Sequence, residues 1–164
     1  LEETTLMTTL PAAAERVQDA AGRLGLGIAI RIMPESTRTA EDAARACGCT
    51  VGQIVKSLIF KGNDSDAPYL FLVSGDNRVN EKKVAAAVGE AIVRPDAQYV
   101  RNATGFAIGG IPPFGHTARI ATFLDRHLFS FETVWAAAGT PNAVFEVATR
   151  QLADRLPHQP IDVT

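Results

Sequence analysis

Several residue types are scarce in this 164-residue chain, and each scarcity excludes a class of protein. The two cysteines, Cys47 and Cys49, are separated by one residue, so a disulfide framework is excluded because so short a bridge would be strained. No apolar run approaches the roughly 20 residues of a membrane span. The net charge is -2, from 16 basic and 18 acidic residues, which leaves no broad cationic face for long nucleic acid. We therefore expect a cytoplasmic protein that binds neither membranes nor DNA.

The composition that remains is typical of a globular domain. The chain is 46% hydrophobic and 21% charged, with 13 glycines and 9 prolines, which is neither disordered nor collagen-like. Its length suits one domain with a core that is stable without disulfides. The first methionine is Met7 and no secretory signal is evident. We expect residues 1–10 to be a disordered or vector-derived segment and residues 11–164 to form the domain.

Hydrophobic periodicity and turn residues predict interleaved helices and strands. The predicted helices cover residues 11–24, 39–47, 80–88, 95–102 and 149–156. The predicted strands cover residues 27–33, 54–60, 69–73, 119–124, 133–138 and 143–147. Because these elements alternate without a strict β-α-β rhythm, the pattern indicates an α/β domain whose mixed sheet is surrounded by helices.

Lys56 is unusual because it lies inside an apolar predicted strand. Residues alternate between the two faces of a strand, and both faces of the segment from Ile54 to Phe60 are apolar. A desolvated ammonium needs a partner or a ligand. Alternatively, Lys56 lies near a sheet edge and its ammonium extends into water. The pattern alone leaves both interpretations open.

The segment from residue 105 to residue 116 is too rich in glycine and proline for a regular element. The adjacent Gly109 and Gly110 would allow close backbone approach to a ligand and present N–H groups to an oxyanion. Pro112 stiffens the loop, and His116 at its end could face the same ligand. Alternatively, the segment is a tight connection between strands, in which His116 makes a hydrogen bond that stabilises the loop.

Other kinds of chemistry have little support in the sequence. The three histidines are not at metal-ligand spacing from one another or from the cysteines, so we expect no metal site. No nucleophile elbow, P-loop or dinucleotide fingerprint occurs, so we expect no cofactor. Asn142, in the Gly/Pro loop 139–142, could reach a polar ligand. The residues alone therefore predict a ligand pocket near Lys56 and the glycine loop.

Five segments occur in an order that resembles a known family. They are Thr39–Ala44, Gln53–Leu58, Ser74–Asp76, Thr104–His116 and Ala138–Pro141. This set resembles the YbaK/EbsC family, the free-standing relatives of the editing insertion domain of bacterial prolyl-tRNA synthetase, and covers roughly residues 17–156. The resemblance implies one α/β domain with a curved, barrel-like mixed sheet, and hydrolysis of mischarged aminoacyl-tRNA.

The resemblance also implies roles for particular residues. Lys56 matches the family lysine at the substrate pocket near the tRNA 3′ end. Gly109 and Gly110 match glycines whose backbone groups hold the aminoacyl ester, and these three positions are the expected catalytic residues. The expected substrate-binding residues are Ser57, Ile111, Pro112, His116 and Asn142. Some branches carry His or Asp in the loop 139–144; here Asn142 is the nearest polar residue, so a charged group is missing.

The function expected from the resemblance is metal-independent, cofactor-free hydrolysis of an aminoacyl-tRNA ester in trans. The substrate would be the acceptor end of tRNA(Pro) mischarged with alanine, cysteine or a similar small amino acid, and prolyl-tRNA synthetase is a candidate partner. No activating base is visible, and a terminal ribose hydroxyl of the substrate can orient the water. The alternative is a non-catalytic adaptor that binds an aminoacyl or nucleotide group in the same pocket.

Overall fold

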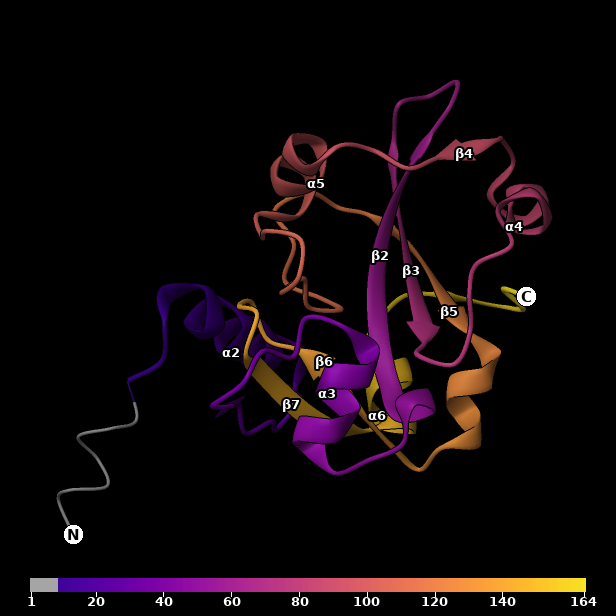
Figure 1. Ribbon diagram of the computed structural model, residues 1–164. Helices are drawn as coiled ribbons and strands as arrows, with labels where there is room; N and C mark the ends of the chain where they lie inside the picture. Colours follow the sequence, from indigo (N-terminus) through magenta and orange to yellow (C-terminus); the bar gives the residue numbers. More distant parts are fainter. Residues whose placement is uncertain (1–8) are drawn as a thin grey trace, which may run out of the picture.

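Residues 9–164 are described from a computed structural model of the chain (Figure 1). We expected a disordered or vector-derived segment at residues 1–10, and residues 1–8 of that segment lie outside the described residues. Within the described part there are five α-helices, α2 (Ala12–Leu24), α3 (Ala40–Cys47), α4 (Glu81–Val88), α5 (Ala97–Thr104) and α6 (Thr149–Arg155). There are also two short 3-10 helices, η1 (Val51–Gln53) and η2 (Arg126–Ser130).

One mixed sheet forms the centre of the domain. Its strands are β1 (Arg31–Ile32), β2 (Ile54–Gly62), β3 (Pro68–Ser74), β4 (Ile92–Val93), β5 (Ala121–Asp125), β6 (Thr133–Ala137), β7 (Ala143–Ala148) and β8 (Gln159–Ile161). The order is β1-β7-β6-β2-β3-β5-β8, and β4 also pairs with β2. The pairs β2–β6, β3–β5 and β5–β8 are parallel and the others are antiparallel. The predicted mixed α/β sheet is confirmed.

The sheet is open, so the expected barrel-like sheet is not a closed barrel. Among the described residues the end strands β1 and β8 do not pair with each other. The predicted strand 27–33 is reduced to the two residues of β1, while Ile28 and Ile30 pack against the core without strand pairing. The short elements β4, η2 and β8 were not predicted, because two to five residues carry too little periodicity to be recognised.

Helices cover both faces of the sheet (Figure 1). On one face α2 and α6 pack into the largest core cluster, which includes Val17 of α2 and the fully buried Phe145 of β7. On the other face α3 packs against Ile54 and Trp135, and α4 packs Val84 onto a second cluster. The start of α3 is fixed by Thr39, whose hydroxyl accepts a hydrogen bond from Asp42 N at 3.0 Å.

The sheet has a gap along one edge of β2. On this edge β6 pairs only with Ile54 and Val55, and β4 pairs only with Lys61 and Gly62. The opposite edge of β2 is paired with β3 from Val55 to Lys61. Among the described residues, positions 56–60 therefore have no strand on the β6 side. Because β2 and β6 separate here, the fold leaves space beside Lys56 that side chains and loops must line.

Candidate active site

A cavity of about 270 Å³ lies where β2 and β6 separate. It is lined by β2, the end of β6, the segment that leads into α3, and the glycine loop between α5 and β5. Its lining is mainly apolar, with Ile54, Trp135 and Val144 among the buried contributors. The charged residues in the lining, Arg38 and Lys56, are both cationic. Such a cavity suits a ligand with an apolar part and a carbonyl or anionic part.

Four of the eight predicted site residues line this cavity. They are Lys56, Ser57, Gly109 and Ile111. They come from two segments about 50 residues apart in the chain, so the predicted meeting of the lysine strand with the glycine loop is found in the structure. The other four, Gly110, Pro112, His116 and Asn142, do not line the cavity.

Lys56 is half-buried, and its ammonium is held by a neutral group. Its Nζ donates to the main-chain carbonyl of Asn77 at 2.5 Å. No carboxylate among the described residues lies within ion-pair distance of it. Burial lowers the pKa of Lys56 below its usual value, and the negative charges of Glu41 and Asp125 oppose this shift. Of the two interpretations of Lys56, the structure supports the pocket lysine over one that extends into water.

The two adjacent glycines occupy different environments. Gly109 has φ +103°, and it is the third residue of a turn closed by the Gly110 N–H, which donates to Ala107 O at 3.2 Å. Within residues 9–164 the N–H of Gly109 itself has no hydrogen-bond partner. A Cβ at Gly110 would lie 2.7 Å from Thr140 N. Gly109 therefore lies in the cavity wall with an unpaired N–H, whereas Gly110 allows two loops to pack closely.

His116, Pro112 and Asn142 stabilise loops in this structure. His116 Nε2 lies 2.7 Å from the carbonyl oxygen of Pro112, and burial lowers the pKa of His116. This contact agrees with the alternative in which His116 makes a hydrogen bond that stabilises the loop. Asn142 donates its side-chain amide to Met33 O at 3.0 Å and accepts from Met33 N through its main chain at 2.8 Å. It therefore joins the loop 139–142 to the segment after β1.

Ser57 lines the cavity but its hydroxyl is sealed from solvent. Its Oγ is buried and has no hydrogen-bond partner among the described residues. Ile111 belongs to the main core cluster and is 8% exposed, so it supports the cavity wall as well as lining it. Among the eight predicted site residues, these contacts leave Lys56 and the Gly109 N–H as the polar groups at the cavity.

Arg38 is the lining residue that sequence reasoning missed. It is exposed, and a Cβ at Gly109 would lie 2.8 Å from Arg38 Nε, so its side chain lies across Gly109 at the cavity. The segments that carry the family resemblance begin one residue later, at Thr39. In the sequence, an arginine at a ligand site looks the same as any solvated surface arginine. A guanidinium in this position could bind a phosphate.

The cysteines, the potential metal ligands and the helix lengths give no sign of another kind of site among the described residues. Cys47 and Cys49 are free and half-buried, and burial raises the pKa of Cys47 to about 11, which disfavours the reactive thiolate. No cluster of three potential metal ligands occurs between residues 9 and 164. In the same part of the chain, none of the helices is long and apolar enough to span a membrane.

The chain belongs to the aminoacyl-tRNA editing domain family, whose family model matches residues 34–155. It is 33% identical over 119 residues to the uncharacterized protein YwhH of Bacillus subtilis (strain 168), which covers 73% of this chain and 75% of that protein. It is 30% identical over 96 residues to the proline–tRNA ligase of Thermoanaerobacter sp. (strain X514). That alignment covers 57% of this chain and only 16% of the ligase.

Solved structures agree with this assignment. The fold is similar to that of a protein described as a proposed trans-editing enzyme for prolyl-tRNA synthetase, with a TM-score of 0.89, 43% identity and coverage of 95% of this chain and 99% of the other. It is also similar to the hypothetical protein APE2540, with a TM-score of 0.83, 30% identity and coverage of 90% and 98%. The predicted family and fold are therefore confirmed.

Proposed function

We propose that this editing domain is an aminoacyl-tRNA hydrolase that acts in trans on mischarged tRNA. The observation that carries the proposal is the placement of Lys56 and the unpartnered Gly109 N–H on one largely apolar cavity. An amide donor and an ammonium at a water-poor site can stabilise the charge that develops on an ester carbonyl. Family membership supports the same chemistry.

In the proposed reaction a water molecule attacks the carbonyl carbon that joins the amino acid to the terminal ribose. The carbonyl oxygen becomes an oxyanion, which the Gly109 N–H stabilises, while Lys56 holds the carbonyl or the terminal phosphate. The bond to the ribose oxygen then breaks, and that oxygen takes the proton lost by the water. The products are the free amino acid and uncharged tRNA. A neighbouring ribose hydroxyl orients the water, and no metal or cofactor takes part.

The cavity favours an uncharged side chain on the amino acid. Its inner wall consists of apolar residues, among them Ile54, Trp135 and Val144, and contains no carboxylate that would pair with a basic side chain. Alanine and cysteine on tRNA(Pro) are the substrates we propose. A synthetase distinguishes such side chains from its own by only about 1–3 kcal/mol per methylene, which is why a second hydrolytic site is useful.

The proposed partner is the acceptor end of the mischarged tRNA, in the cytoplasm, with prolyl-tRNA synthetase as a second candidate. Arg38, which lines the cavity, is the contact that we propose for a terminal phosphate. With a net charge of -2 the domain would make few phosphate contacts. We therefore expect tRNA binding to weaken only moderately as the salt concentration rises.

The test is deacylation of a panel of tRNA(Pro) charged with alanine, cysteine or proline. We expect release of alanine or cysteine and retention of proline, with the rate falling at least tenfold in Arg38→Ala. A panel of other mischarged tRNAs covers different substrates. If the protein binds alanyl-tRNA(Pro) but hydrolyses no charged tRNA in either panel, the adaptor alternative replaces the enzyme.

A further inference from the structure

A buried carboxylate lies next to the turn that holds Lys56. Asp125, at the end of β5, is 2% exposed. Its Oδ2 accepts from Ser74 N at 3.1 Å and from Asn77 Nδ2 at 2.9 Å, and its Oδ1 accepts from His127 N at 3.0 Å. No ammonium or guanidinium of the described residues pairs with it. Burying a charge is costly, so a carboxylate that has only neutral donors requires an explanation.

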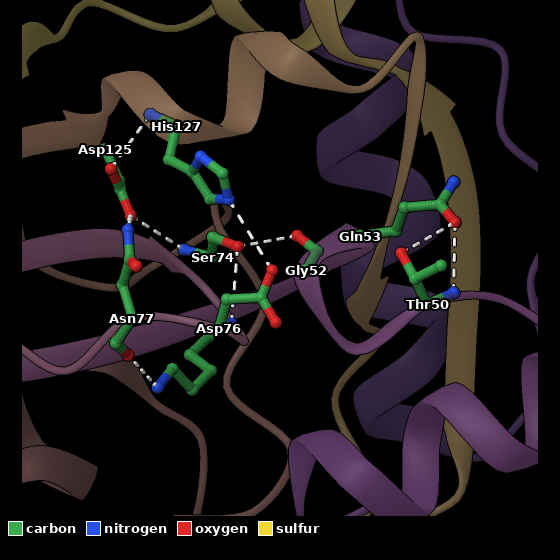
Figure 2. Close-up of polar contacts among 9 residues, drawn as sticks. Thr50, Gly52, Gln53, Ser74, Asp76, Asn77, Asp125 and His127 are labelled. Carbon is green, nitrogen blue, oxygen red and sulfur yellow. Dashed lines mark hydrogen bonds and ion pairs between the residues drawn. The ribbon is translucent and has the colours of Figure 1, made fainter.

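The bonds to Asp125 fix the turn after β3 from both ends (Figure 2). Ser74 is the first residue of this turn and Asn77 is the last, and Asn77 N also donates to Ser74 O at 2.9 Å. The Ser74 hydroxyl is anchored in turn, because it donates to Gly52 O at 2.7 Å. The turn is therefore held by side chains from two strands and by the segment that precedes β2.

The same turn supplies the group that holds Lys56. The side chain of Asn77 bonds to Asp125, while its main-chain carbonyl accepts from Lys56 Nζ. A continuous path of two hydrogen bonds thus joins the buried carboxylate to the ammonium at the cavity. The two residues also interact electrostatically, because the negative charge of Asp125 favours the protonated form of Lys56.

We propose that Asp125 is a positioning residue, which fixes the Asn77 carbonyl and thereby holds the Lys56 ammonium at the cavity. The effect of Asp125 on catalysis rests on the hydrolase function proposed above. Asp125 itself does not line the cavity and touches no substrate. Its role is to keep the turn in one conformation and to supply a compensating charge that does not neutralise Lys56 by direct contact.

The other charges around Lys56 define what the test must separate. Glu41 on α3 also favours the ammonium, whereas Arg78 after β3 and Arg94 after β4 disfavour it. Arg38 lies on the same cavity. Substitution of Asp125 leaves these four residues in place, so the resulting change in Lys56 reports the lost carboxylate and the loosened turn.

The decisive measurement is an NMR titration of the Lys56 side chain in the full chain labelled with 13C-lysine. The variants are Asp125→Asn, Asn77→Ala and, as a control, Asp162→Asn. Asp162 is an exposed carboxylate that pairs with Arg126 at 3.2 Å and lies outside the path. We expect the Lys56 pKa to fall in the first two variants and to remain at its wild-type value in the control.

A deacylation assay of the same variants tests the catalytic consequence. Misplacement of a catalytic group by about 1 Å can cost roughly 100-fold, so we expect kcat to fall roughly 10- to 100-fold with little change in KM. Should Asp125→Asn not fold, Asn77→Ala decides, because it keeps the carbonyl and removes only the link. An unchanged Lys56 titration in folded Asn77→Ala would overturn the inference. Absence of deacylase activity in the wild type would instead refute the proposed function, and the titration would still decide the role of Asp125.

Discussion

The strand β2 carries two lysines whose surroundings differ. Lys61, near the hairpin that leads to β3, lies 3.8 Å from the Asp66 carboxylate and 5.6 Å from the centre of the Tyr99 ring. Lys56, at the cavity end of the same strand, is held by a neutral carbonyl and has no carboxylate partner among the described residues. The charge of Lys61 is paired within the protein, whereas the charge of Lys56 is the one that we propose for a ligand.

The same contrast applies to other polar groups at the two ends of β2. At the hairpin end Glu90 accepts hydrogen bonds from the Ser65 hydroxyl and the Tyr69 hydroxyl, which lower its pKa to about 2. At the cavity end the Gly109 N–H and the Ser57 hydroxyl have no partner among the described residues. Native structures satisfy most buried polar groups, so a region that leaves several unpaired is a candidate for function.

The largest expected effect separates the two lysines. Lys56→Ala should reduce deacylation at least 100-fold, comparable to the loss of one oxyanion donor in other enzymes, which is roughly 100- to 1,000-fold. Lys61→Ala should leave kcat/KM within about threefold of the wild type, because an exposed ion pair contributes little. Deacylation of mischarged tRNA(Pro) by both variants, with circular dichroism to check folding, gives the comparison. Similar activity of the two variants would remove Lys56 from the site.

Gly110 is expected to matter for stability because a larger residue would collide with backbone. In Gly110→Ala the new Cβ would lie 2.8 Å from Gly139 C, so one of the two loops must move. Overpacking of this kind typically costs about 1–3 kcal/mol of the free energy of unfolding. The control is Gly22→Ala in α2, where the new Cβ would meet no described atom within 4 Å apart from the adjacent helix backbone, and stabilisation of about 0.5–1 kcal/mol is expected. Urea unfolding of both variants measures the difference; equal stabilities would show that the loops separate easily.

The glycine loop and the hairpin end of β2 should also respond to different pH ranges. Burial lowers the pKa of His116 below 6.5, so the neutral imidazole is favoured in the folded state. Its contribution to stability is complete above pH 6.5 and is lost as the pH falls through the folded pKa. Glu90 at the hairpin end contributes in the same direction, but its contribution is lost between pH 4.5 and about 2.

The measurement is the free energy of unfolding of the wild type and His116→Gln between pH 8 and pH 5. The wild type should lose stability relative to the variant as the pH falls below 6.5, by less than the effect expected for Gly110→Ala. Parallel curves for the two proteins would mean that His116 titrates identically in the folded and unfolded states.

Local pattern accounts for what the sequence predicted correctly. The strands at residues 54–60 and 69–73 and the helix at residues 39–47 were predicted from hydrophobic periodicity and turn residues, and they correspond to β2, β3 and α3. Lys56 stood out because a lysine in an apolar strand is rare. These features depend on residues that are close in the chain, where periodicity and capping act directly.

The direction in which loop residues face could not be read from the sequence. Gly109 and Gly110 are the same residue type, but the turn that closes at Gly110 leaves Gly109 in the cavity wall and packs Gly110 against Gly139 and Thr140. The contact between the loop 139–142 and the segment after β1, through Asn142 and Met33, joins positions more than 100 residues apart. Such contacts follow from the assembled sheet, so no local signal identified Arg38, Asn77 or Asp125 as neighbours of the cavity.

The smallest expected effect is that of Ser57→Ala, which is compared with Ser74→Ala on the neighbouring strand. The Ser57 hydroxyl has no partner among the described residues, whereas the Ser74 hydroxyl donates to Gly52 O at 2.7 Å and accepts from Asp76 N at 3.4 Å. Leaving a buried polar group unsatisfied costs about 1–3 kcal/mol. Ser57→Ala removes such a group and should change the free energy of unfolding by less than about 1 kcal/mol, in the stabilising direction. Ser74→Ala leaves Gly52 O unpaired and should destabilise the fold by about 1–3 kcal/mol.

Urea unfolding of both variants tests the pair, and a loss in Ser57→Ala as large as that in Ser74→Ala would mean that the Ser57 hydroxyl is satisfied in solution. If Ser57→Ala keeps its stability but deacylates more slowly, the hydroxyl contacts the substrate, as the family resemblance implies.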